Sequence, residues 1–150
     1  MFQSARAKLG LVNSQLFDEH EFFKAMSTDI KSANRSILIE SPFITLRRAI
    51  EFSNLCHNII VKGVVVSVHT RNPNHHDGNL RDQALMGIKY LQEAGIRVIA
   101  HNDLRHRKIA IVDKDILWEG SLNMLSHSNS REIMRRTHSK DLVNQMLKFI

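Results

Sequence analysis

The residues with the clearest capacity for chemistry lie close together in the last third of the chain. His106 and Lys108 are two positions apart at the start of an apolar run, so on a strand their side chains leave the same face. This pair suits a phosphodiester, because a lysine can bind a non-bridging oxygen while a histidine attacks phosphorus or protonates the leaving oxygen. Gly120, Ser121 and Asn123 follow the next apolar run and can bring backbone, hydroxyl and amide donors to the same phosphate.

These residues and one aspartate form a motif of defined spacing. The pattern HxK-x4-D-x6-GSxN is made by His106, Lys108, Asp113, Gly120, Ser121 and Asn123. It resembles the motif of the phospholipase D superfamily, and the runs ILIESPFI and GIRVIAHND resemble strands of the same family. The resemblance covers roughly residues 18–140. It implies a phospholipase D-like fold and a metal-independent phosphodiesterase chemistry that uses no cofactor.

The resemblance also implies a role for each polar residue of the site. His106 would be the nucleophile and form a phosphohistidine intermediate, while a second copy of the histidine acts as acid and then as base. Lys108 and Asn123 would hold the phosphate, and Ser121 would add a hydrogen bond. Glu132 resembles the downstream acid of the family and would orient the imidazole from its far nitrogen.

One copy of the motif predicts an assembly of two chains. A length of 150 residues fits a single domain, residues 1–150, so a second half-site must come from another chain. The chemistry needs one group that attacks phosphorus and another that protonates the leaving oxygen, and one histidine cannot do both at once. We therefore expect a homodimer in which a two-fold axis brings the two histidines together.

The charge of the chain favours a polyanionic partner. Lys and Arg number 21 against 15 Asp and Glu, which gives a net charge of +6 and a pI near 9.8. Nucleic acid and an acidic membrane surface both fit this charge. Five arginines flank the motif and either contact neighbouring phosphates or form a solvated basic face; these are Arg105, Arg107, Arg131, Arg135 and Arg136.

Three functions are compatible with these features. The leading interpretation is a nuclease that cleaves DNA or RNA. A phospholipase D acting on phospholipid head groups is the second, and the lack of an amphipathic or apolar docking segment weighs against it. The third is a catalytically weak nucleic-acid-binding or dimerisation module, although every expected chemical role has an occupant in the motif.

The sequence predicts neither a metal site nor a membrane span. Histidines occur at positions 69, 75, 76 and 101, but no carboxylate or cysteine lies at a recognisable ligand spacing. Cys56 is the only cysteine and is expected to be a small buried side chain within a helix. The longest apolar stretch, residues 59–68, is too short to cross a bilayer, and residues 1–17 lack the apolar block of a signal peptide. A cytoplasmic location is expected.

Alternating strands and helices must position the motif. Apolar residues at helical spacing predict helices over residues 18–33, 46–57 and 80–91, the last closed by Gly95. Apolar, β-branched runs predict strands over residues 36–44, 61–69 and 96–100, with a loop over residues 70–79. This order of elements is typical of parallel strands joined by right-handed crossovers.

The order of elements changes at the motif itself. Residues 108–112 and 116–118 are short apolar runs with three polar residues between them, which predicts an antiparallel hairpin. Asp113 is assigned to shaping this turn more than to touching substrate, and Trp118 to the core. A closing helix is expected over residues 139–150. The predicted fold is α/β, with a mixed, mainly parallel β-sheet flanked by helices on both faces.

Overall fold

The computed structural model of the chain describes residues 13–150. The start of the predicted domain and most of the segment tested for a signal peptide fall within residues 1–12, outside the described residues. Within residues 13–150, no helix has both the length and the apolar character needed to cross a membrane.

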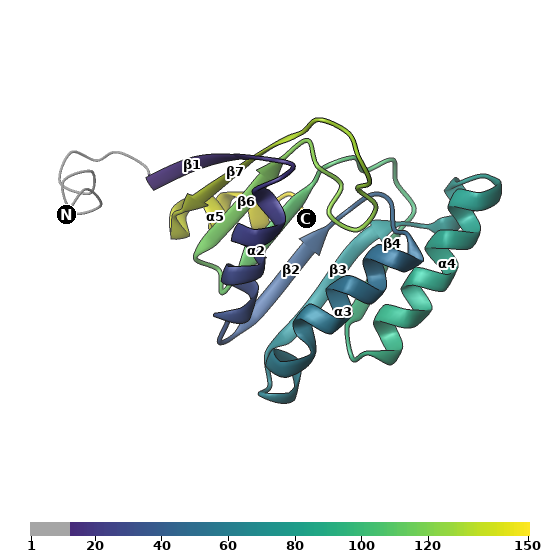
Figure 1. Cartoon of the computed structure of the whole chain (residues 1–150), viewed down its shortest axis with the longest axis horizontal. Coiled ribbons are helices and arrows are strands. Elements are labelled where there is room, and N and C mark those ends of the chain that lie inside the picture. Colours follow the sequence, from purple (N-terminus) through teal and green to yellow (C-terminus); the bar gives the residue numbers. More distant parts are fainter. Residues whose placement is uncertain (1–12) are drawn as a thin grey trace.

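Seven strands form one sheet with the order β1-β7-β6-β5-β2-β3-β4 (Figure 1). The strands are β1 (Asn13–Asp18), β2 (Ser36–Glu40), β3 (Val65–Arg71), β4 (Arg97–His101), β5 (Ile109–Val112), β6 (Ile116–Gly120) and β7 (Ile133–His138). The pairings β2·β3 and β3·β4 are parallel, and the other four are antiparallel. The predicted mixed α/β fold is confirmed, although the mixed sheet is less parallel than expected.

Two strands missing from the sequence interpretation account for part of this difference, because they add the antiparallel pairings β1·β7 and β6·β7. The antiparallel pairing of β5 with β2 accounts for the rest. β1 and β7 pair with each other along their whole length and place β1 at one edge of the sheet. Their sequences, NSQLFD and IMRRTH, carry many polar and charged residues and only short apolar stretches. They therefore lack the continuous apolar run that marked the buried strands, and their pairing depends on contacts between the two ends of the chain.

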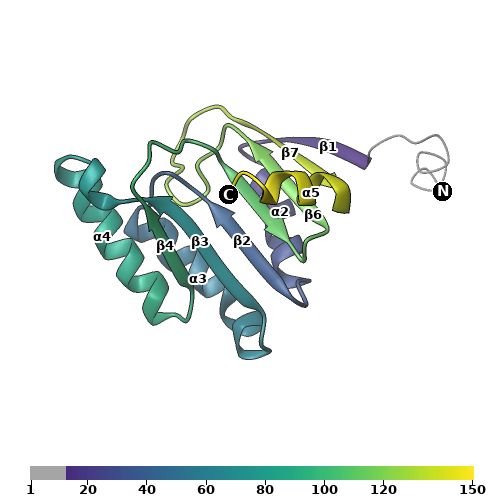
Figure 2. The same ribbon diagram turned by 180° about the vertical axis from the view of Figure 1, so that it is seen from behind.

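Helices cover both faces of the sheet, as predicted. The larger layer contains α2 (Phe22–Lys31), α3 (Leu46–Val61) and α4 (Gly78–Glu93), and α5 (Lys140–Leu147) lies on the opposite face (Figures 1 and 2). A short 3-10 helix, η1 (Pro73–His75), begins the loop before α4. We call these two faces of the sheet the α3 face and the α5 face.

Local chemistry explains where the elements begin and end. The Thr45 hydroxyl caps α3 by accepting the amide of Arg48 at 3.3 Å, so the helix begins at Leu46, as predicted. Gly63 has φ +96° after α3, so the strand predicted from residue 61 starts instead at Val65. The helix predicted from Asp18 starts at Phe22, because the Asp18 carboxylate holds a turn by accepting the amides of residues 20 and 21.

The strand and helix boundaries nearest the motif follow the same rules. The strand predicted over residues 36–44 ends at Glu40, and Pro42 lies in the loop that follows. Asp113 and Lys114 both have positive φ, at 54° and 58°, and form the tight turn of the predicted β5–β6 hairpin. The closing helix is shorter than expected, and Ser139 caps it by accepting the amide of residue 142.

The core on the α3 face contains one buried charge. Trp118 and Cys56 are both fully buried, as predicted, and burial raises the pKa of the Cys56 thiol to about 12. The indole N–H of Trp118 donates to Asp29 at 2.8 Å, and the Arg136 guanidinium binds the same carboxylate at 2.8 and 2.9 Å. These bonds offset the cost of burying Asp29 and tie α2 to β6 and β7.

Candidate active site at the start of β5

His106 and Lys108 lie directly before β5, at the end of the sheet where β2 and β3 finish. Strand β5 runs antiparallel to β2, so Ile109 at its start pairs with Glu40 at the end of β2. Crevices beyond the carboxyl ends of parallel strands are the usual ligand sites of α/β sheets. His106 is exposed there and Lys108 is 8% exposed, so an accessible imidazole adjoins a largely buried ammonium.

The two side chains are in direct contact. Lys108 Nζ lies 2.7 Å from His106 Nδ1 and 3.4 Å from Nε2, and it also donates to the backbone carbonyl of His106 at 2.6 Å. The positive charge of Lys108, together with burial and the charge of Arg71, lowers the pKa of His106. Burial lowers the pKa of Lys108, and the charge of Glu132 opposes this shift. The cation therefore favours a neutral imidazole, the form that can act as a nucleophile.

The Gly-Ser-Asn part of the motif leaves β6 at the same end of the sheet. A Cβ on Gly120 would lie 2.2 Å from the carbonyl oxygen of Ile133, so only glycine allows this approach of β6 to β7. The Ser121 hydroxyl accepts the amide of Ile133 at 3.1 Å and lies 3.4 Å from its carbonyl oxygen. Asn123 Oδ1 is buried without a hydrogen-bond partner in the described part of the chain. Asn123 is thus the residue of this group whose buried side chain still has an unused hydrogen-bond acceptor.

Glu132 lies near the pair but does not hold the histidine. Its charge raises the pKa of Lys108, whereas Lys108 occupies the position at His106 Nδ1 that Glu132 was expected to take. Over residues 13–150, no hydrogen bond joins the Glu132 carboxylate to His106. The Glu132 amide donates to Glu19 at 3.1 Å. A hollow of about 320 Å³ adjoins this position and is lined by Asp18, Glu19, Ser121, Arg131, Glu132 and Ile133.

The structure separates Asp113 from the other motif residues. Asp113 follows β5, and the whole length of that strand lies between it and Lys108. Its carboxylate accepts the amides of Asn34, Arg35 and Ser36 at 2.9, 2.7 and 3.1 Å. Burial opposes ionisation of Asp113, but these three bonds prevail and lower its pKa. Asp113 therefore joins the β5–β6 turn to the start of β2, at the opposite end of β5 from Lys108.

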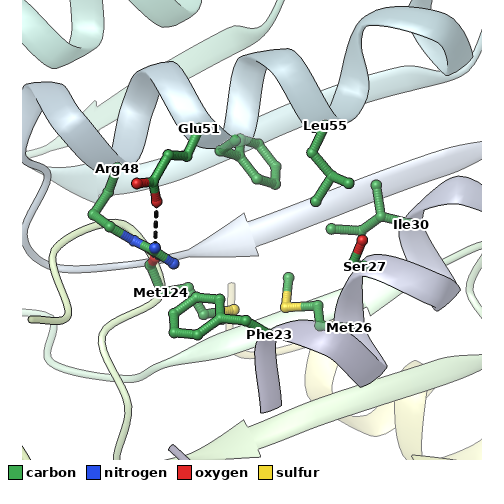
Figure 3. Close-up of a pocket in the computed structure, with 9 residues that line it drawn as sticks. Phe23, Met26, Ser27, Ile30, Arg48, Glu51, Leu55 and Met124 are labelled. Carbon is green, nitrogen blue, oxygen red and sulfur yellow. Dashed lines mark hydrogen bonds and ion pairs between the residues drawn. The ribbon is translucent and has the colours of Figure 1, made fainter. Parts of the chain in front are cut away.

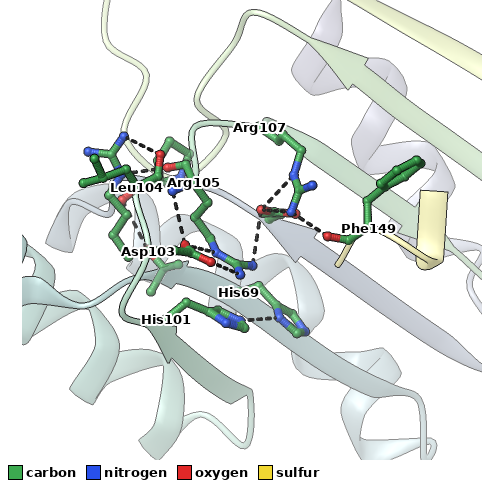
Figure 4. Close-up of polar contacts among 11 residues, drawn as sticks. His69, His101, Asp103, Leu104, Arg105, Arg107 and Phe149 are labelled. Atoms are coloured by element: carbon green, nitrogen blue, oxygen red, sulfur yellow. Dashed lines mark hydrogen bonds and ion pairs between the residues drawn. The ribbon is translucent and has the colours of Figure 1, made fainter.

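Two of the five predicted phosphate-contacting arginines point to the wrong face of the sheet. Side chains alternate along an extended segment, so Arg105 and Arg107 lie on the α5 face while His106 and Lys108 lie on the α3 face. Arg105 and Arg107 both bind one oxygen of Glu40, which is fully buried, at 3.2 to 3.3 Å (Figure 4). Arg105 also binds Asp103, and Arg107 donates to the carbonyl of residue 149 at 2.8 Å. These arginines anchor residues 105–108 to the α5 face of the sheet.

The remaining three arginines divide into two groups. Arg136 is held by Asp29 in the core and is not available to a ligand. Arg131 is 89% exposed and lies 3.5 Å from Glu19, beside the hollow that contains Glu132. Arg135 is exposed, with no side-chain partner among the described residues. Arg131 and Arg135 therefore keep their predicted role as candidate contacts to nucleic acid.

Three residues from other elements complete the surroundings of His106, and the sequence interpretation missed them. The ring of Phe43 lies 6.2 Å from the ring of His106 and 5.2 Å from the ring of His76. Arg71, at the end of β3, places its guanidinium carbon 5.2 Å from the centre of the Phe43 ring. Phe43 was placed within the predicted strand over residues 36–44 and His76 in the predicted loop over residues 70–79, and neither position carried a motif signal.

Two other polar or hollow regions lie outside this site. On the α5 face, His69 and His101 are hydrogen-bonded to each other at 2.9 Å, and burial lowers the pKa of both (Figure 4). Between α2 and α3, a cavity of about 230 Å³ is lined by apolar side chains and by the Arg48–Glu51 ion pair (Figure 3). None of the six motif residues lines this cavity. Within residues 13–150, no three His, Cys, Asp or Glu side chains are grouped to hold a metal ion.

Known structures share the fold of this chain. NucT from Helicobacter pylori superposes with a TM-score of 0.74 at 20% identity and 92% coverage of both chains. Nuc from Salmonella typhimurium, a phospholipase D family member, superposes with a TM-score of 0.75 at 18% identity, covering 92% of this chain and 91% of that one. TrmBL2, an archaeal chromatin protein that binds DNA, gives 0.61 at 12% identity, covering 98% of this chain and 55% of that one. No curated protein matches the chain by sequence.

A family model decides the membership of the chain. The model described as "Cardiolipin synthase, PLD-like domain" matches residues 26–150, which include every motif residue from His106 to Asn123. The predicted resemblance to the phospholipase D superfamily is confirmed. Because the match spans most of its length, the chain belongs to the phospholipase D-like domain family, a family of phosphodiesterase enzymes.

Proposed function

We propose that this chain is a metal-independent nuclease that cleaves the nucleic-acid backbone through a phosphohistidine formed on His106. The observation that carries the proposal is the contact between His106 and Lys108, in which a cation lowers the pKa of an exposed imidazole. The basic charge of the chain supports a polyanionic substrate. The fold shared with NucT and Nuc supports the same class of substrate.

The geometry implies a rearrangement when substrate binds. A lysine that donates to His106 Nδ1 leaves the proton of the neutral ring on Nε2, where it blocks attack. Binding of a phosphate oxygen would draw Lys108 Nζ away from the ring. The Nδ1–H tautomer, oriented by Glu132, would then present a free lone pair on Nε2.

The reaction itself needs two histidines. His106 Nε2 forms a bond to phosphorus as the bond to the leaving oxygen breaks, and the histidine of a second copy gives that oxygen a proton. The second histidine then takes a proton from the water that attacks the phosphohistidine, and this step releases the phosphate and restores both groups. We propose a homodimer with one shared active site at its interface, to which each chain contributes its histidine. Leu104 supports this arrangement, because it is two residues from His106 and 78% exposed.

The alternatives stay open to the same experiment. A nucleic-acid-binding module without turnover has support from the shared fold with TrmBL2, a DNA-binding protein. Phospholipid head groups are the remaining substrate class. The cytoplasmic location predicted from the sequence is also still a proposal.

The test is an incubation with plasmid, single-stranded DNA, RNA and phosphatidylcholine vesicles in the presence of a chelator. We expect cleavage of at least one nucleic acid, no release of choline, and loss of cleavage in His106→Ala. His138→Ala is the matched control, because His138 is exposed at the opposite end of the sheet and should retain full activity. Activity that a chelator abolishes and a divalent ion restores would contradict the metal-free mechanism. Choline release without nucleic-acid cleavage would favour the lipid alternative.

A further inference from the structure

Arg71 is a cation that the structure adds to the active site from outside the motif. It is the last residue of β3, and its Nε donates to the carbonyl of Arg105 at 2.7 Å. Its Nη2 donates to the carbonyl of Leu104 at 3.3 Å. The side chain is therefore fixed to the backbone that leads directly into His106.

The Arg71 guanidinium is held by backbone carbonyl groups and not by a carboxylate. Arg105, Arg107 and Arg136 each bind a buried acid, whereas Arg71 donates to two backbone carbonyls. Its Nη1 has no hydrogen-bond partner within residues 13–150. The Arg71 side chain thus keeps a full positive charge and spare donors, which is the state in which arginine binds phosphate.

The position of Arg71 differs from that of Lys108. Lys108 contacts the His106 ring directly. A group that binds the phosphate under attack must lie this close to the nucleophile. Arg71 instead lies against the ring of Phe43, which also meets His106 edge-on. Its charge still reaches the site, because it lowers the pKa of both His106 and Lys108.

We propose that Arg71 binds the phosphate next to the scissile one, so that the site selects a polynucleotide over a diester with a single phosphate. The inference rests on the proposed nuclease function and specifies the substrate class of the same site. A phosphatidylcholine head group or a small synthetic diester carries one phosphate, whereas every internal linkage of a nucleic acid has charged neighbours. A second fixed cation beside the His106–Lys108 pair is useful only for a nucleic acid, whose neighbouring phosphate it can bind.

The kinetic test compares a fluorescent single-stranded oligonucleotide with bis(4-nitrophenyl) phosphate. Loss of one charge-assisted contact predicts that Arg71→Gln lowers kcat/KM for the oligonucleotide by about tenfold or more. The loss for the small diester should be smaller by about the same factor, because that substrate has no neighbouring phosphate. Arg97→Gln is the matched control, since Arg97 is exposed at the start of β4 and should leave both activities unchanged.

A binding measurement separates this inference from the nuclease proposal. In a His106→Ala background, Arg71→Gln should flatten the plot of log affinity against log salt for the oligonucleotide by about 0.7, and Arg71→Lys should preserve the slope. An unchanged slope, or equal losses on both substrates, would overturn the role of Arg71. A wild-type chain that cleaves neither substrate would contradict the nuclease proposal, while the salt slope would still decide whether Arg71 contacts phosphate.

Discussion

At the scale of single residues, the site depends on the effect of Lys108 on the pKa of His106. Lys108 lies 2.7 Å from His106 Nδ1 and is the main cause of the lowered pKa of that ring. A nucleophilic histidine must be neutral. Because the pKa of His106 lies below the ordinary 6.5, the pH range in which the ring is neutral extends to lower pH. The acid limb of activity should therefore lie below pH 6.5.

The first prediction is that Lys108→Met raises the pKa of His106. Removal of the neighbouring positive charge favours the imidazolium form, so the midpoint of the His106 titration should move upwards. The ring proton resonances of His106, followed by NMR across pH 4 to 9 or so, measure this midpoint without any need for activity. His138, which is remote from Lys108, serves as the internal control in the same spectra. A pKa that falls or stays constant in the variant would mean that Lys108 does not control the ionisation of His106.

The second prediction distinguishes two neighbouring arginines. Arg135→Ala should reduce the salt dependence of nucleic-acid binding by about one phosphate contact, with little change in stability. Arg136→Ala should instead lower the free energy of unfolding by about 3 kcal/mol, because it leaves the buried Asp29 carboxylate unpaired. Thermal or urea unfolding and a salt titration of binding, measured on both variants, test this division. Equal stability of the two variants would show that the Asp29–Arg136 pair is not needed in the core.

The sequence predicted the contact between His106 and Lys108 better than the partners of the arginines around them. Residue type and spacing were sufficient for this contact, because an extended segment places alternate residues on one face. The partners of Arg105 and Arg136 are Glu40 and Asp29, which are 65 and 107 positions away in the chain. Local spacing carries no information on such pairs, so buried ion pairs could not be separated from exposed basic residues.

At the scale of elements, the strands with apolar runs could be predicted, and the β1–β7 pair could not. The continuous apolar runs of β2 and β5 indicated burial directly. The strands β1 and β7 consist largely of polar residues and are joined only when the two ends of the chain meet. The start of β3 was misplaced because Val61 is apolar enough for a strand, yet it ends a helix and is 73% exposed.

The third prediction concerns the turn that joins β5 to β6. Asp113→Ala should lower the free energy of unfolding by about 2 kcal/mol, because three backbone amides lose their acceptor and alanine disfavours the positive φ. Asp113→Asn keeps an acceptor and tolerates this φ, so its loss should be smaller. Turnover per folded molecule should not change in either variant, since the turn lies at the far end of β5. Urea unfolding and active-site-normalised kinetics measure the two effects separately.

The pH dependence of this contribution follows from the lowered pKa of Asp113. A carboxylate with a depressed pKa stabilises the fold above its unfolded value of 3.8, and the effect is lost as pH falls through the folded pKa. The stability gap between wild type and Asp113→Asn should therefore close in strongly acidic solution. A difference in stability that persists in strongly acidic solution would mean that the shape of the Asp113 side chain, and not its charge, stabilises the turn.

At the scale of the whole molecule, the proposed mechanism needs two copies of the site. The described residues place His106 exposed at one end of the sheet, with Arg71 on the β3 side and Arg131 beside the Glu132 hollow. A two-fold axis near His106 would double each of these features and create one basic groove across both subunits.

The fourth prediction is that mixed dimers of wild type and His106→Ala lose turnover at the shared site. Sedimentation should give the mass of two chains, and Leu104→Asp should shift the equilibrium towards monomer by placing a charge in the contact. Leu80→Asp is the matched control, because Leu80 is also exposed but lies on α4. A monomer with full specific activity would show that the second histidine is unnecessary.

The four residues Arg105 to Lys108 also constrain which changes in length the chain can accept. Their side chains alternate between two faces, so that anchors and catalytic groups interleave one by one. A deletion or insertion of one residue just before β5 would exchange the two sets, with arginines in the crevice and the His–Lys pair against Glu40. A change of two residues would keep each set on its own face. The side chains of this segment therefore keep their faces only if its length changes by an even number of residues, and natural variation in its length should occur in even steps.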